Sequence, residues 1–98
     1  MLNDKVARHM AICKDLSNLY ARKNADYGDS FARSYTEYGL AMPCIRLDDK
    51  LSRLKSLRNR PAQVHDESLR DTLMDLANYA IMTIVELDLR KEQEVIQK

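Results

Sequence analysis

The stretch DESLRDTLMDLANYAIMTIVEL, residues 66–87, decides the fold class. Apolar side chains recur in it at every third or fourth position, which is the spacing of one face of an α-helix. Asp66 is a suitable N-cap, and the pattern predicts a helix over about residues 67–94. Its expected core face consists of Leu69, Leu73, Leu76, Ala80, Ile84 and Leu87.

The same spacing predicts three further helices before this one. Residues 4–23 form the first, which is expected to end near Asn24; a short helix over about 31–38 stops at Gly39, and a third covers about 43–57. Short connections between long helices favour antiparallel neighbours. We therefore predict one all-α domain over residues 1–98, an antiparallel helical bundle of three long helices plus one short helix.

The composition excludes several classes of protein. Sixteen Lys and Arg residues against fifteen Asp and Glu give a net charge of +1, which lacks the basic excess of a protein that wraps nucleic acid. No segment resembles a signal peptide or a membrane span, so we expect a cytoplasmic protein with Cys13 and Cys44 reduced and buried. His9 and His65 lie apart from each other and from any cysteine pair, and neither forms a recognisable zinc ligand set.

A polar stripe interrupts the apolar surface of the last predicted helix. Asp71, Asp75, Asn78 and Met82 fall within one narrow stripe on the side away from the expected core face. Apolar residues border this stripe and form a second apolar surface, which a chain of this size could hardly cover alone. We therefore expect a homodimer or homotetramer with a carboxylate-lined cleft near the subunit interface.

The third helix carries the complementary charges. If the connection turns near residue 62, Asp49 lies level with Asp75, Arg53 with Asp71, and Arg46 with Asn78. Converging carboxylates suit Mg²⁺ or Mn²⁺, and neighbouring Lys and Arg side chains could hold the phosphates that the metal bridges. The alternative is that Arg53 and Asp71 form a salt bridge, that Asp49 is solvated, and that Asp75 and Asn78 specify the register of the helices.

Residues 24–30 also allow two interpretations. Asn, Asp, Gly and Ser residues are typical of turns and helix caps, which by itself explains the composition. Alternatively, Asp26, Tyr27 and exposed backbone N–H groups could bind a nucleobase or a phosphate.

Three stretches together resemble the nucleotide-modification-associated domain found mainly in phages and prophages. They are KNADYGDSF at 23–31, RLDDKLSRL at 46–54 and DESLRDTLMDLANYA at 66–80, and the resemblance covers about residues 20–85. A more distant similarity is to the all-α, MazG-like nucleoside triphosphate pyrophosphohydrolases. Those enzymes cut between the α and β phosphates with Mg²⁺ held by acidic residues on two antiparallel helices.

The resemblance implies roles for individual residues. Asp71 and Asp75 look like the second acidic motif, although they are four positions apart where three is commoner, and Asp49 is the candidate for the first motif. Ser52 and Arg53 stand where a second carboxylate is expected. The first hypothesis is a Mg²⁺-dependent hydrolase of phage or prophage nucleotide metabolism. In it Asp49, Asp71 and Asp75 hold the metal and catalyse, Lys50 and Arg53 bind phosphate, and Asp26, Tyr27 and Asn78 recognise base or sugar.

Two other hypotheses belong to different classes. Because one acid is missing, the chain could be a non-catalytic nucleotide-binding or assembly module that has lost the complete metal site. In the third hypothesis the chain is a structural helical adaptor, whose Met and Tyr side chains on the last helix form only a subunit interface.

Overall fold

The structure is a computed structural model that describes residues 2–59 and 66–97. In this part of the chain the protein is built from α-helices alone. The helices are α1 (Leu2–Tyr27), α2 (Ser30–Tyr38), α3 (Ala41–Arg58) and α4 (Asp66–Gln97). They divide into two compact units, Met1–Ser30 and Phe31–Lys98, each described by itself. The predicted all-α class is confirmed. None of the described helices is long and apolar enough to cross a membrane.

The first unit consists of α1 and the turn that ends it. The expectation that this helix stops near Asn24 was wrong, because it continues through Tyr27. Gly28 and Asp29 then both adopt positive φ, and the Asp29 N–H donates to the Asn24 carbonyl over 3.3 Å. Within residues 24–30, the first four residues are therefore helical, and the turn begins only at Gly28.

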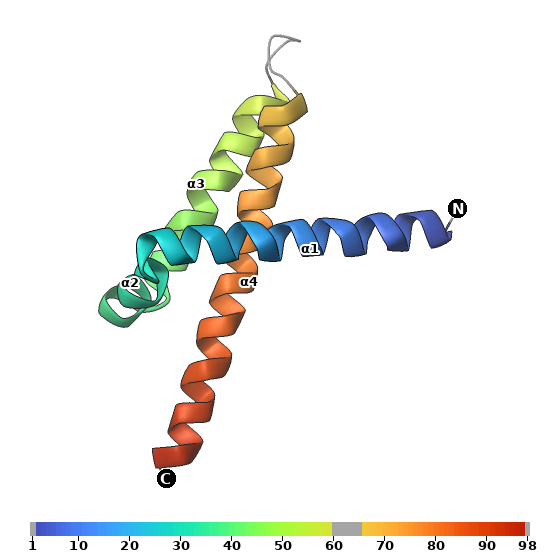
Figure 1. Ribbon diagram of the computed structural model, residues 1–98. Helices are drawn as coiled ribbons and strands as arrows, with labels where there is room; N and C mark the ends of the chain where they lie inside the picture. Colours follow the sequence, from blue (N-terminus) through green and yellow to red (C-terminus); the bar gives the residue numbers. More distant parts are fainter. Residues whose placement is uncertain (1, 60–65, 98) are drawn as a thin grey trace. The chain divides into compact units, whose positions relative to one another are not determined.

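The second unit is organised by the antiparallel pair of α3 and α4, which Figure 1 shows side by side over the first half of α4. Two contacts fix the register. Lys50 lies against Asp75, and Arg53 lies against Thr72. Each pair is displaced by one residue from the predicted levels of Asp49 with Asp75 and Arg53 with Asp71. The turn predicted near residue 62 lies outside the described residues.

The face that α4 presents to its neighbours differs from the predicted core face. Thr72 and Glu86 are buried on α4, and the side chains of Asp75, Tyr79 and Met82 between them are partly buried. Most of the predicted core face is exposed, with Leu73 46%, Ile84 55% and Leu87 47% accessible. Only part of the polar stripe therefore packs inward: Asp75 pairs with Lys50 of α3, whereas Asp71 and most of the leucine face stay exposed.

The buried apolar residues of the second unit gather around α2 and the start of α3. Tyr35, Met42 and Pro43 are buried, and the ring of Phe31 stacks on Tyr79 with centroids 6.2 Å apart. This cluster joins α2 to α4. The expectation that both cysteines are buried was wrong: Cys13 and Cys44 are exposed free thiols.

Gly39 separates α2 from α3 in a left-handed conformation, with φ of 66°. Its N–H donates to the Tyr35 carbonyl over 2.7 Å and so completes the last turn of α2. A Cβ at this position would meet no atom within 4 Å. Only backbone conformation therefore opposes a larger residue.

We expect Gly39→Ala to lower the free energy of unfolding by about 1 kcal/mol, because L-residues other than Asn and Asp are strained in this region. Gly39→Asn is the matched control and should cost clearly less. Urea unfolding followed by circular dichroism measures both variants. Equal stability of the alanine variant and the parent protein would contradict the argument.

Candidate functional site

The candidate site is the face where α3 and α4 pair. Lys50 Nζ lies 3.1 Å from Asp75 Oδ2, and the two side chains are 29% and 32% accessible. The pair is therefore reachable by solvent and by a ligand on one side, while the helix pair shields the other. A lysine and a carboxylate at this distance form an ion pair that an incoming anion or cation could open.

Arg53 extends this face by one turn of α3. Its Nε donates to the Thr72 hydroxyl over 3.1 Å, and Thr72 is only 2% accessible. Only Nε takes part in this hydrogen bond, and the two terminal nitrogens of the guanidinium do not contact the Thr72 hydroxyl in it. Lys50 and Arg53 are three residues apart, which is a rise of about 4.5 Å along a helix and places the two cations next to each other.

The three predicted metal ligands are not brought together. Asp75 is paired with Lys50, whereas Asp49 and Asp71 are exposed. Among the described residues no group of three or more His, Cys, Asp or Glu side chains is close enough to hold a metal ion. The one-residue shift in register explains this, because it brings Lys50 rather than Asp49 to face Asp75.

Mg²⁺ does not need three protein carboxylates when a nucleotide is present. It is commonly bound by one or two carboxylates, with phosphate oxygens and waters completing the octahedron. Asp75, with Asp71 one turn earlier on α4, satisfies that smaller requirement. These carboxylates therefore suit a metal ion that is also bound by the phosphates of a nucleotide. They are too few for a metal ion bound by the protein alone.

The remaining predicted site residues are placed as follows. Asn78 is partly buried on α4, one turn beyond Asp75, and Arg46 is exposed on α3. Asp26 and Tyr27 are exposed on the last turn of α1, in the first unit, and are not loop residues as predicted. His65 lies outside the described residues.

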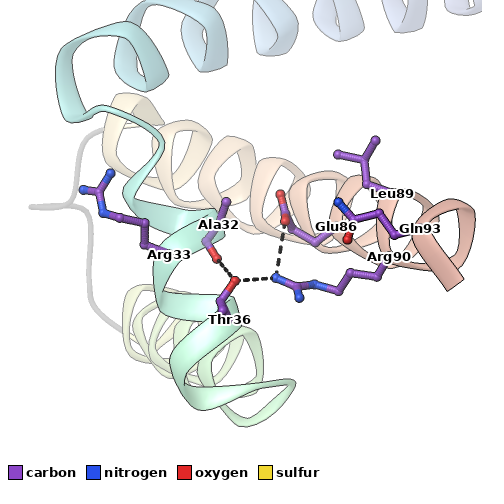
Figure 2. Close-up of a pocket in the computed structure, with 7 residues that line it drawn as sticks. All are labelled: Ala32, Arg33, Thr36, Glu86, Leu89, Arg90 and Gln93. Carbon is purple, nitrogen blue, oxygen red and sulfur yellow. Dashed lines mark hydrogen bonds and ion pairs between the residues drawn. The ribbon is translucent and has the colours of Figure 1, made fainter. Parts of the chain in front are cut away.

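Sequence reasoning missed a second polar cluster, between α2 and α4, where the structure has a cavity of about 270 Å³. Figure 2 shows Arg90 of α4 reaching toward α2. Its Nη2 donates to the Thr36 hydroxyl over 2.9 Å and lies 3.8 Å from Glu86 Oε1. The Thr36 hydroxyl donates in turn to the Ala32 carbonyl over 3.0 Å.

Arg90 ties the two helices together. Its guanidinium carbon lies 4.4 Å from the centroid of the Tyr35 ring, a cation–π contact, and its buried Nε has no hydrogen-bond partner among the described residues. The Glu86 and Arg90 spacing of four was a signal in the sequence, because it is that of a helical ion pair. The threonine and tyrosine partners come from a distant segment and were not predictable from spacing.

Comparison with known proteins supplies the family. No curated protein and no solved structure is significantly similar to the chain. The sequence profile of the family described as nucleotide modification associated domain 1 matches residues 23–87, about two thirds of the 98-residue chain. This range includes Lys50, Arg53, Thr72 and Asp75. The chain therefore belongs to the nucleotide modification associated domain 1 family.

Proposed function

We propose that this protein acts on a nucleotide, and that the α3–α4 face binds the phosphates. The observation that carries the proposal is the Lys50–Asp75 pair at 3.1 Å, beside Arg53 and inside the range that the family profile matches. It provides two adjacent cations and one carboxylate on a partly exposed surface.

The charges of the site favour a nucleotide that arrives with a metal ion. A phosphate that binds Lys50 without a metal ion would be repelled by the Asp75 carboxylate, because Asp75 is in direct contact with Lys50. If Asp75 held a Mg²⁺ ion, its charge would be neutralised and Lys50 would be free to bind a phosphate oxygen. The planar guanidinium of Arg53 suits a second phosphate.

The activity we propose is hydrolysis of a free or modified nucleoside triphosphate to the monophosphate and pyrophosphate. Mg²⁺, when bound, supplies charge neutralisation and a more acidic water. In this proposal Asp75 and Asp71 hold the metal and Lys50 and Arg53 orient the phosphates. Asn78, one turn beyond Asp75 on α4, takes part in recognition of base and sugar. Asp49 joins the metal site, and Asp26 and Tyr27 join the recognition site, from a second copy of the chain. The exposed leucine face of α4 supports a homodimer or homotetramer.

A second candidate function is non-catalytic nucleotide binding. It is favoured by the position of Arg53, which stands where the distant resemblance expects a second carboxylate and which donates to Thr72. In that case Lys50 and Arg53 bind phosphate without a metal, and no bond is cleaved.

Thermal melting separates these functions. We expect Mg²⁺ and a nucleoside triphosphate together to raise the melting temperature on the order of 10 °C at ligand concentrations near 100 Kd, and each alone to raise it much less. Chromatography of the same mixtures should show monophosphate and pyrophosphate. A shift that nucleotide causes without metal and without products indicates the binding module. If no nucleotide of a broad panel shifts the melting temperature, both candidate functions are contradicted, and the hypothesis of a structural adaptor is the one that remains.

A further inference from the structure

The first unit carries a pair of metal-ligating side chains that the nucleotide site does not use. His9 and Cys13 are four residues apart on α1, and Cys13 Sγ lies 3.7 Å from His9 Nδ1. Both side chains are exposed. They lie outside residues 23–87, so the family match says nothing about them.

The separation of these two atoms is that of two ligands on one zinc ion. Zn–S bonds of about 2.3 Å and Zn–N bonds of about 2.0–2.1 Å, at a tetrahedral angle, place sulfur and nitrogen about 3.6 Å apart. The observed 3.7 Å, at which the two side chains form a hydrogen bond, is close to this separation, so rotation of the side chains would suffice to turn both donor atoms toward one ion. The backbone of α1 fixes the relative positions of the two residues, so only their side-chain rotamers need to be ordered on binding.

One chain supplies only half of a tetrahedral site. Among the described residues, no three or more His, Cys, Asp or Glu side chains lie close enough together to hold a metal ion. A structural zinc site takes four ligands, commonly two cysteines and two histidines. A second copy of the same helix provides the missing two.

The surface around the pair suits contact with that second copy. Val6 and Met10 lie within one turn of His9 and are 57% and 66% accessible, which makes this part of α1 apolar and open. Two such helices that pack through this face would bury both residues and bring the donors of each copy together. We propose that two copies of this chain bind one Zn²⁺ through His9 and Cys13 of each copy. Each Cys13 thiol loses its proton to solvent on binding.

Cobalt substitution tests the proposal on the full chain under a phosphine reductant. We expect Co²⁺ to produce the absorption of a tetrahedral thiolate complex, to saturate at one ion per two chains, and to be displaced by Zn²⁺. Sedimentation should show that the metal increases the fraction of dimer or of a higher even-numbered assembly. Cys13→Ser and His9→Ala should each abolish the thiolate absorption.

Cys44→Ser is the matched control, because Cys44 is also an exposed thiol and should leave the absorption unchanged. Since His9 and Cys13 are exposed, their variants should keep the helical circular dichroism of the parent, which excludes misfolding as the cause. Saturation at one ion per chain, thiolate absorption that survives Cys13→Ser, or a dimer that forms only as a disulfide without reductant would overturn the proposal. None of these readouts depends on nucleotide binding.

Discussion

Tyr35→Ala is expected to lower the free energy of unfolding by about 3–5 kcal/mol, the cost of truncating a buried aromatic side chain. Tyr35 is 8% accessible and its ring lies under the Arg90 guanidinium at 4.4 Å. The substitution therefore removes buried apolar surface and a cation–π contact together. Because the second unit has few other buried apolar residues, we expect the loss to be a large share of its stability.

Two variants control this prediction. Tyr38→Ala removes the same side chain from the same helix at a position that is 63% accessible, and it should change stability by less than about 0.5 kcal/mol. Tyr35→Phe keeps the ring under Arg90 and should retain most of the stability. Chemical unfolding followed by circular dichroism and by tyrosine fluorescence measures all three. Similar losses for Tyr35→Ala and Tyr38→Ala would contradict the packing argument.

The second large effect is expected from Asp75→Asn, which should abolish formation of monophosphate and pyrophosphate while the protein remains folded. An amide keeps the shape of the side chain and removes the charge that we propose holds the metal. The Lys50–Asp75 pair is about a third exposed, so its loss should cost at most about 1 kcal/mol of stability. Product analysis and unfolding curves on the same preparation give both results.

Asp75→Asn also separates the two candidate functions. If phosphate binds without a metal, removal of the carboxylate frees Lys50, and the variant should bind nucleotide more tightly than the parent. If a metal is required, binding should lose its dependence on Mg²⁺ and weaken. Calorimetric titration with and without Mg²⁺ distinguishes these outcomes. Loss of folding in Asp75→Asn would instead mean that the residue specifies helix register.

Lys50→Ala completes the test of the site. A hydrogen bond between charged groups contributes about 1.5–3 kcal/mol, so nucleotide binding should weaken by about tenfold or more. Lys55 is exposed on another face of α3, and Lys55→Ala should leave binding unchanged. Equal weakening in both variants would indicate non-specific attraction rather than a site at Lys50.

The sequence was a good guide where the structure depends on neighbours along the chain. Helical spacing predicted the four helices, and glycine predicted the end of α2 at Gly39. The antiparallel register of α3 and α4 was predicted to within one residue. The error at Asn24 has a local cause: Asn, Ala, Asp and Tyr can continue a helix, and only the left-handed Gly28 and Asp29 end it.

The errors in the core concern which face of a helix packs inward. The apolar stripe of α4 and its polar stripe were both visible in the sequence, and hydrophobicity favoured burial of the leucines. The structure instead buries Thr72 and Glu86 and partly buries Asp75. Lys50 and Arg53 find partners on α4 across one helix interface, and Arg90 finds one on α2.

The sequence by itself thus determined the helices and their order, because a helix depends on hydrogen bonds and side-chain spacings within a few residues. It also fixed which residue types are available for chemistry. Only the tertiary structure decided which charges meet. A shift of one residue turns a helical side chain by about 100°, and this replaces Asp49 with Lys50 opposite Asp75. It also joined Thr36 and Arg90, which are 54 residues apart. Local patterns carry no information about such contacts, since these arise only when whole helices pack.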